Sequence, residues 1–113
     1  MTIPPLDPVE ATIRAVRARG VDAVDEAAVT LAWWRVLLPE LERRVGTRIG
    51  SLLTDRELEE VRTIPPGEQL TRWLSATLPA YRELVEEETD QLVWLAVSWY
   101  LVGAGRADQV DAP

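Results

Sequence analysis

The chain has 113 residues, 47% of them hydrophobic, which is typical of one folded globular domain. It contains no cysteine, no histidine and no lysine, so all twelve of its basic residues are arginine. These absences exclude disulfides and thiolate metal sites, and they remove the usual groups that activate a nucleophilic serine or threonine. Nineteen acidic residues give a net charge of -7, which argues against binding to nucleic acid or to an anionic membrane surface.

Cellular location is predicted from the N-terminal segment and from the length of the longest apolar run. The N-terminal segment lacks the basic and apolar regions of a signal peptide. The longest apolar run, Leu92 to Ala104, is shorter than the roughly 20 residues of a membrane-spanning helix. We therefore expect a cytoplasmic protein, and the lack of lysine, asparagine and phenylalanine suggests a bacterial coding sequence rich in GC.

Helical spacing of apolar residues predicts an all-α fold, with a single bundle of five or six helices over residues 1–113. Asp7 and Pro8 have the pattern of a cap followed by a first helical residue, which predicts a helix over 8–19. Asp22 or Asp25 caps the second helix, which is expected to kink or break at Pro39 because proline lacks the amide hydrogen.

The second half of the chain has equally clear helix signals. Thr54 and Glu57 form a capping-box pattern that predicts a short helix over about 55–62. A further helix is expected over 67–77, and Pro79 kinks or breaks the chain before a last helix that reaches Gly103. The tails, residues 1–7 and 106–113, are expected to fray.

The segment Leu92–Val102 is apolar on every side, whereas a surface helix usually has a polar face. Such a helix is either surrounded by its own chain or covered by a partner. The second alternative predicts a non-enzymatic protein-interaction or assembly module, which binds itself as a homo-oligomer or binds another protein. The predicted interface residues are Trp94, Leu95, Val97, Trp99, Tyr100 and Leu101, with help from Trp33 or Trp34.

Glu88 interrupts an apolar seam that runs along the last helix at helical spacing. A buried carboxylate needs a partner, and Arg48 has a similar position on the apolar stripe of an earlier helix. We expect the two side chains to form a buried ion pair. The alternative is that Glu88 lies at the rim of the helix, exposed to solvent.

One catalytic alternative depends on acids spaced three residues apart, namely Glu57, Glu60, Glu87 and Asp90. Residues three apart share a helix face, and paired carboxylates suit Mg²⁺. The spacing resembles that of the all-alpha nucleotide pyrophosphohydrolases, and the resemblance implies Mg²⁺ at a substrate pyrophosphate. The same acids also fit a solvated face without a cofactor, or an acidic antagonist of a basic protein that uses the face over 86–90.

A longer pattern resembles a family. One segment of the chain consists of Trp73-Leu74, four further residues, Pro79-Ala80-Tyr81, then Leu84-Val85 and a run of glutamates. This segment resembles a bacterial helical domain of unknown function. Blocks at 41–49 and 53–60 are similar to the same family, so the resemblance spans about residues 20–90. It implies a small helical accessory module, with no known activity or site. The Trp-rich apolar C-terminal helix departs from the charged helix that is usual in the family.

Overall fold

The computed structural model describes residues 7–103 and 105. Within them the chain is all-helical and has no strand. The elements in chain order are α1 (Pro8–Ala18), α2 (Glu26–Ala32), the π-helical turn η1 (Trp33–Leu37), α3 (Leu38–Leu52), α4 (Asp55–Val61), α5 (Glu68–Thr77) and α6 (Tyr81–Gly103). The all-α prediction is therefore confirmed.

Local chemistry places the helix ends. The Asp7 carboxylate accepts hydrogen bonds from the backbone amides of Val9 and Glu10, so Asp7 caps α1. Asp25, and not Asp22, caps α2. The capping box of α4 is present in both directions, between Thr54 and Glu57. The remaining residues of the tails that were expected to fray lie outside the described part of the chain.

The two prolines have different effects. α2, η1 and α3 follow one another without a break, and Pro39 lies in the first turn of α3. The amide of Leu38 bonds to the carbonyl of Trp33, five residues back, so the wider π turn lies just before the residue that cannot donate. At Pro79 the helix stops, because the preceding residue Leu78 adopts an extended conformation.

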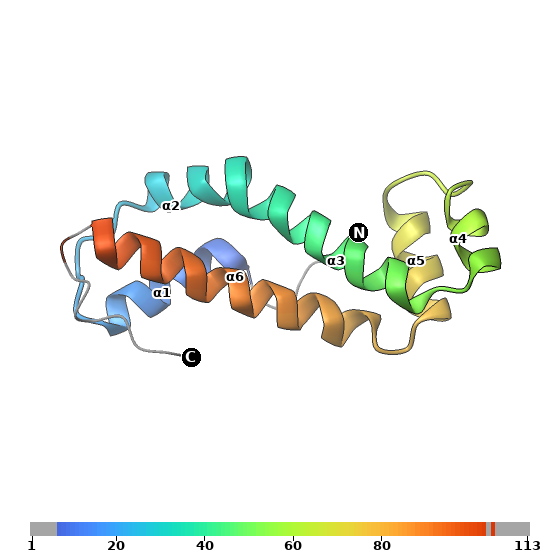
Figure 1. Ribbon diagram of the computed structural model, residues 1–113. Helices are drawn as coiled ribbons and strands as arrows, with labels where there is room; N and C mark the ends of the chain where they lie inside the picture. Colours follow the sequence, from blue (N-terminus) through green and yellow to red (C-terminus); the bar gives the residue numbers. More distant parts are fainter. Residues whose placement is uncertain (1–6, 104, 106–113) are drawn as a thin grey trace.

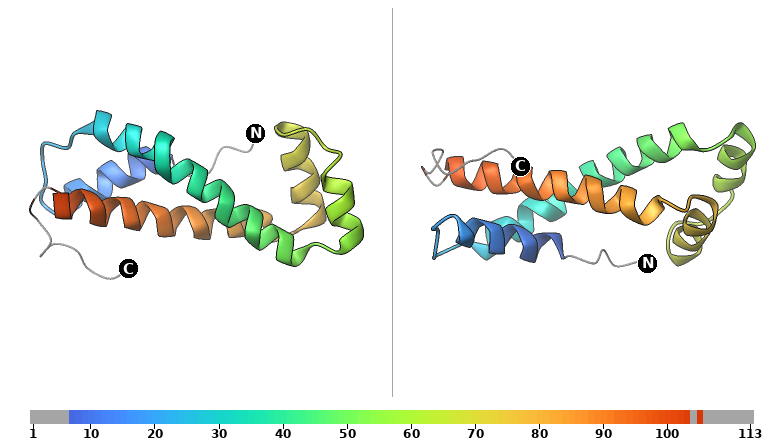
Figure 2. Two further views of the ribbon diagram at one scale, coloured as in Figure 1. Left: turned by 45° about the horizontal axis from the view of Figure 1, so that its top comes forward. Right: turned by 90° about the horizontal axis from the view of Figure 1, so that it is seen from below.

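The molecule is elongated, with extents of 50 × 25 × 20 Å (Figure 1). Its radius of gyration is 16.3 Å, whereas a compact chain of this length has about 13 Å. The continuous α2–η1–α3 segment and α6 run along the long axis, α1 lies beside them at one end, and α4 and α5 form the other end (Figures 1 and 2).

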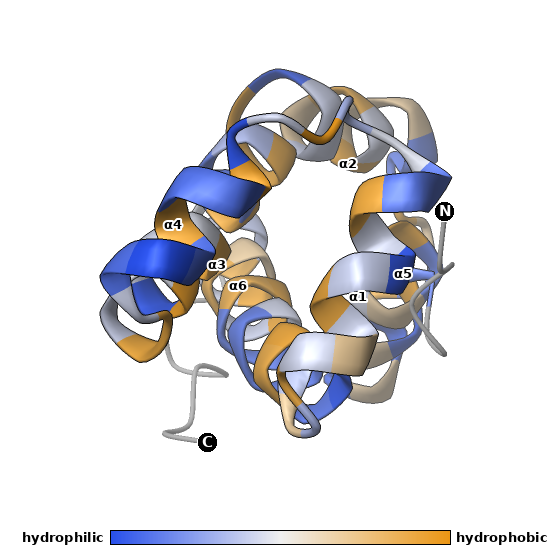
Figure 3. Ribbon diagram, turned by 90° about the vertical axis from the view of Figure 1, so that its right-hand side faces the viewer, coloured by the Kyte–Doolittle hydropathy of each residue, from blue (hydrophilic) through white to orange (hydrophobic). Residues whose placement is uncertain are grey.

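The core lies where α1, α2, η1, α3 and α6 meet. Its buried residues form two clusters, Ile13, Val29, Trp33, Leu37, Leu41, Leu92 and Ala96, and then Val16, Val97 and Leu101. Three further buried leucines, Leu53, Leu74 and Leu84, lie toward the α4–α5 end. Hydrophobic and hydrophilic residues alternate along the helices in Figure 3, as expected for amphipathic helices that bury one face.

Candidate functional site: an apolar groove at Trp99

Exposed apolar side chains gather at one end of the molecule. Of the large hydrophobic residues that are exposed within the described part, five lie on α2, η1 and the last turns of α6, namely Leu31, Trp34, Val36, Trp99 and Val102. The sixth, Leu52, lies at the far end of α3. Single exposed apolar residues are normal, but a concentration of them at one place marks a binding surface.

A groove runs between the two helical segments at this end. One hollow of about 200 Å³ lies beside Ala28, Ala32, Ala96 and Trp99. A second hollow, of about 540 Å³, is lined by Val36, Leu95 and again Trp99. Because Leu37 and Trp99 line both hollows, they form one surface. We call it the Trp99 groove, with Ala28, Ala32 and Val36 on one wall and Leu95 and Trp99 on the other.

Small side chains keep the first hollow open. Ala28 and Ala32 are one helical turn apart on α2, and Ala96 faces them from α6. The walls are fixed to each other, because the backbone amide of Asp25 donates a hydrogen bond to the Tyr100 hydroxyl at 2.8 Å. The hollow is therefore part of a well-packed end of the fold.

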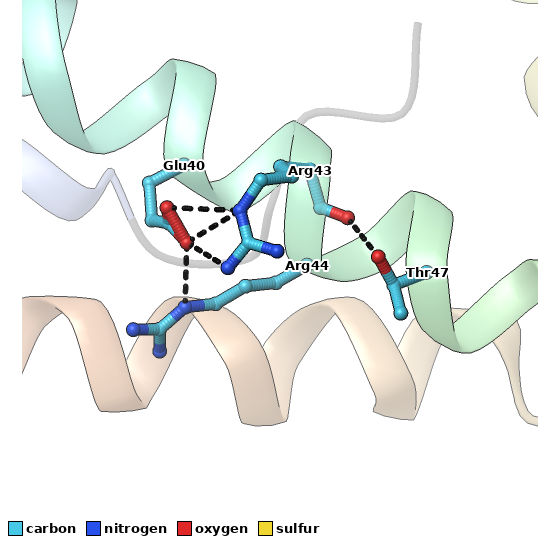
Figure 4. A network of polar contacts seen from close by, with 4 residues as sticks. All are labelled: Glu40, Arg43, Arg44 and Thr47. Atoms are coloured by element: carbon cyan, nitrogen blue, oxygen red, sulfur yellow. Dashed lines mark hydrogen bonds and ion pairs between the residues drawn. The ribbon is translucent and has the colours of Figure 1, made fainter.

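Basic side chains line the other end of the groove. Arg35, Arg43 and Arg44 line the second hollow together with Glu40. Figure 4 shows Glu40 between two of them; it accepts from Nε of Arg43 at 2.9 Å and from Nε of Arg44 at 3.3 Å. Hydrogen bonding from Arg43 is the main reason that the pKa of Glu40 lies below its ordinary value, and the same contact raises the pKa of Arg43. Three guanidinium groups against one carboxylate leave this end positive.

The predicted interface residues divide into an internal and an external set. Trp33, Val97 and Leu101 lie in the core of the chain itself, with exposed fractions of 1% or less, so the prediction that they contact a partner needs correction. The physical reason is that α1 and the α2–η1–α3 segment pack against α6 and bury this side of it. Trp33 also donates from Nε1 to the Thr12 hydroxyl at 2.9 Å.

Trp94 and Tyr100 are half-buried and already have partners within the chain. The guanidinium of Arg19 lies 4.1 Å from the centre of the Trp94 ring, a cation–π contact that joins the end of α1 to α6. Tyr100 bonds to the start of α2, as described above. Leu95, half-buried, and the exposed Trp99 line the groove, while Trp34 is 68% exposed on η1.

Arg48 and Glu88 are brought together. Arg48 Nη1 lies 3.0 Å from Glu88 Oε2 and 3.0 Å from Glu87 Oε2. Glu88 is buried, whereas the side chains of Arg48 and Glu87 remain 41% and 61% exposed, so the pair is buried on one side only. Hydrogen bonding to Glu87 first, and to Glu88 second, raises the pKa of Arg48.

The four acids of the magnesium alternative are not brought into one site. Within residues 7–103 and 105 no three acids lie close enough to hold a metal ion. Glu57 accepts from the backbone of Thr54 in the capping box, and Glu60 accepts from Trp73 Nε1 at 3.1 Å. Asp90 is exposed on α6, one turn beyond Glu87, which bonds to Arg48. Spacing alone did not reveal that a helix cap, a hydrogen bond from Trp73 and an ion pair occupy Glu57, Glu60 and Glu87 in turn.

Several groove residues were missed in the sequence. Ala32 and Val36 fit the apolar stripe of the second helix, and small or apolar residues on such a stripe give no local signal for a binding surface. The one signal was their spacing of four residues, which places them along a single helix face. Glu40 and Arg43, three residues apart, also share a helix face, but surface ion pairs of this spacing are common.

No helix in the described ranges is long and apolar enough to cross a membrane. Searches of the curated proteins and of the solved structures gave no match to this sequence. A family model does match, over residues 16–95, which is most of the chain. The match includes the α2–η1–α3 wall of the groove and ends at Leu95, before Trp99. The chain therefore belongs to the family described as a protein of unknown function, DUF5663.

Proposed function

We propose that this chain is a self-assembling interaction module, which forms a dimer by docking its Trp99 groove against the groove of a second copy. The observation that carries the proposal is that Val36 and Trp99 line the groove and yet are exposed. Three further exposed apolar residues, Leu31, Trp34 and Val102, lie on the same elements outside the groove lining. Each is between 48% and 68% exposed. Apolar area that leaves water contributes about 25 cal/mol per Å², so covering Val36 and Trp99 favours association.

The shape of the surface favours a second copy as the occupant. A two-fold interface uses the same patch on both chains, so that patch must carry both projections and recesses. The Trp99 groove has both, because Val36 and Trp99 stay about half exposed while the alanines beside them leave an open hollow.

The composition of the surface agrees with this role. Interface cores are enriched in aromatic residues and arginine and depleted in lysine and glutamate. The groove and its rim hold Trp99, Tyr100 and three arginines, with Glu40 as the single acid among the lining residues. Tryptophan and arginine are also the residue types that most often dominate binding energy.

The test is a pair of matched substitutions, Val36→Gln in the groove and Leu52→Gln at the far end of α3. The two side chains have nearly equal exposure, 51% and 55%, and glutamine is accepted in helices. In sedimentation velocity over a range of concentrations, Val36→Gln is expected to weaken the dimer while Leu52→Gln leaves it unchanged. Trp99→Ala, which removes a central aromatic side chain, is expected to weaken it by about 30-fold.

Three results would overturn the proposal. The chain remains monomeric at every concentration, or it dimerises equally well with Val36→Gln and Trp99→Ala, or Leu52→Gln is the variant that dissociates. If the chain is monomeric but binds a different protein through Trp99, that protein and not a second copy occupies the groove. Helicity measured by circular dichroism shows that each variant has kept its fold.

A further inference from the structure

We infer that the two copies pair antiparallel, with an orientation specified by opposite charges at the two ends of the Trp99 groove. This inference rests on the self-association proposed above and deepens it by naming how the partner is oriented. The observations that carry it are the position of acidic residues at the α2 end of the groove and of basic residues at the α3 end.

The α2 end is acidic. Asp22 and Asp25 lie in and at the end of the loop before α2, and both are exposed. Asp25 is three residues before Ala28 and seven before Ala32, so it follows the same helix face that forms a wall of the groove. Neither carboxylate takes part in an ion pair within the described ranges, although Asp25 also accepts the amide of Ala28 as a helix cap.

The α3 end is basic. Arg35, Arg43 and Arg44 line it, and Glu40 offsets only one of their three charges. Arg35 forms no ion pair with any residue that the structure describes. This positive surplus stands out in a chain whose net charge is -7. The groove therefore has a polarity, negative at Asp25 and positive at Arg43, over roughly 25 Å of continuous helix.

Two-fold symmetry, together with the opposite charges at the two ends, determines how the two copies are oriented. A two-fold axis that crosses the groove places the acidic end of each copy over the basic end of the other, so two attractive contacts form at once. The spacing matches without adjustment, because both copies have the same distance between their charged ends. A parallel arrangement would instead place acid on acid and base on base, and like charges brought together disfavour association.

Charge reversal at the basic end tests the orientation. Arg43→Glu leaves two arginines against two glutamates at the α3 end, so this end becomes neutral. Both attractive contacts of the antiparallel dimer are then lost, and the dimer is expected to weaken by about tenfold. Arg56→Glu is the matched control, because Arg56 is exposed on α4 and lies away from the groove. If the reversal lowers the helicity of the chain, Arg43→Gln removes the charge without adding repulsion beside Glu40.

A complementary variant sharpens the test. The double change Asp22→Arg and Asp25→Asn makes the acidic end basic and keeps a side chain able to cap α2. This variant alone is also expected to dimerise more weakly. An equal mixture of it with Arg43→Glu is expected to dimerise more tightly than either variant alone, because in the mixed dimer the unchanged acidic end of one chain meets the unchanged basic end of the other.

The results separate this inference from the proposed function. If the unsubstituted chain dimerises, and Arg43→Glu leaves the dissociation constant unchanged or tightens it, the antiparallel orientation is overturned while self-association stands. If the unsubstituted chain is monomeric at every concentration, the proposed function itself fails. Weakening by Arg43→Glu with tighter dimerisation in the mixture supports both, and added salt is then expected to weaken the unsubstituted dimer.

Discussion

Thr12→Val is the most informative change in the core. The Thr12 hydroxyl, 1% exposed on α1, donates to the carbonyl of Pro8 at 2.7 Å and accepts from Trp33 Nε1 at 2.9 Å. Valine has nearly the same shape but no hydroxyl, so it leaves the indole N–H of the fully buried Trp33 without an acceptor. Leaving a buried donor unsatisfied costs about 1–3 kcal/mol.

The chain provides a matched control for this change. Thr89 on α6 is also buried, at 3% exposure, and its hydroxyl donates to the carbonyl of Val85 at 2.7 Å, again four residues back. No other side chain bonds to the Thr89 hydroxyl among the hydrogen bonds of the described residues. Thr89→Val therefore removes the same local bond and adds the same methyl group, but it leaves no donor unsatisfied. The difference between the two variants measures the Trp33 contact alone.

The assay is urea unfolding followed by circular dichroism. We expect Thr12→Val to lower the free energy of unfolding by about 1–3 kcal/mol more than Thr89→Val does. In a Trp33→Phe background, which has no indole N–H, the extra cost of Thr12→Val is expected to disappear. Equal stabilities of Thr12→Val and Thr89→Val would refute the reasoning, since they would mean that the indole N–H does not depend on Thr12.

Two further predictions concern ion pairs. Because the folded-state pKa of Glu40 is lowered, its stabilising contribution is present above its ordinary pKa of 4.5 and is lost as the pH falls through the folded value. Glu40→Gln is therefore expected to lower the free energy of unfolding, measured in urea, by its full amount near pH 7 and by less below pH 4.5. A difference between the two proteins that grows in acid would contradict this. Arg48→Met is expected to lower the melting temperature more than Glu87→Gln, because only the first leaves the buried carboxylate of Glu88 without its partner. Equal melting temperatures would show that Glu88 does not need the arginine.

The helices could be predicted because their signals are local. Asp7, Thr54 and Glu57 act on amides within three residues of themselves, so a short sequence window contains the whole interaction. Pro79 ends a helix for a similarly local reason. The sequence predicted a kink or a break at Pro39 and not a π turn before it. All three forms accommodate the hydrogen bond that proline cannot donate, so the sequence does not distinguish them.

The candidate site was only partly predictable, because it depends on which side of each helix the neighbours cover. Trp33 and Trp34 are adjacent in the sequence, yet one is fully buried and the other is 68% exposed. On α6, Val97 and Trp99 were equally good candidates for an interface, and the packing of α1 decides which one faces the core. Arg19 over Trp94 and the hydroxyl of Tyr100 at Asp25 join residues far apart in the chain, so no spacing rule reveals them.

The most direct test of the proposed function is the molar mass of the purified chain, measured by light scattering over a wide range of concentrations. The Trp99 groove as a self-interface predicts a mass that rises from one chain toward two chains of 12.7 kDa. The rise is expected to shift to about 30-fold higher concentration in Trp99→Ala and to stay in place in Leu52→Gln. A mass that stays at one chain at every concentration would contradict the proposal that a second copy covers the groove.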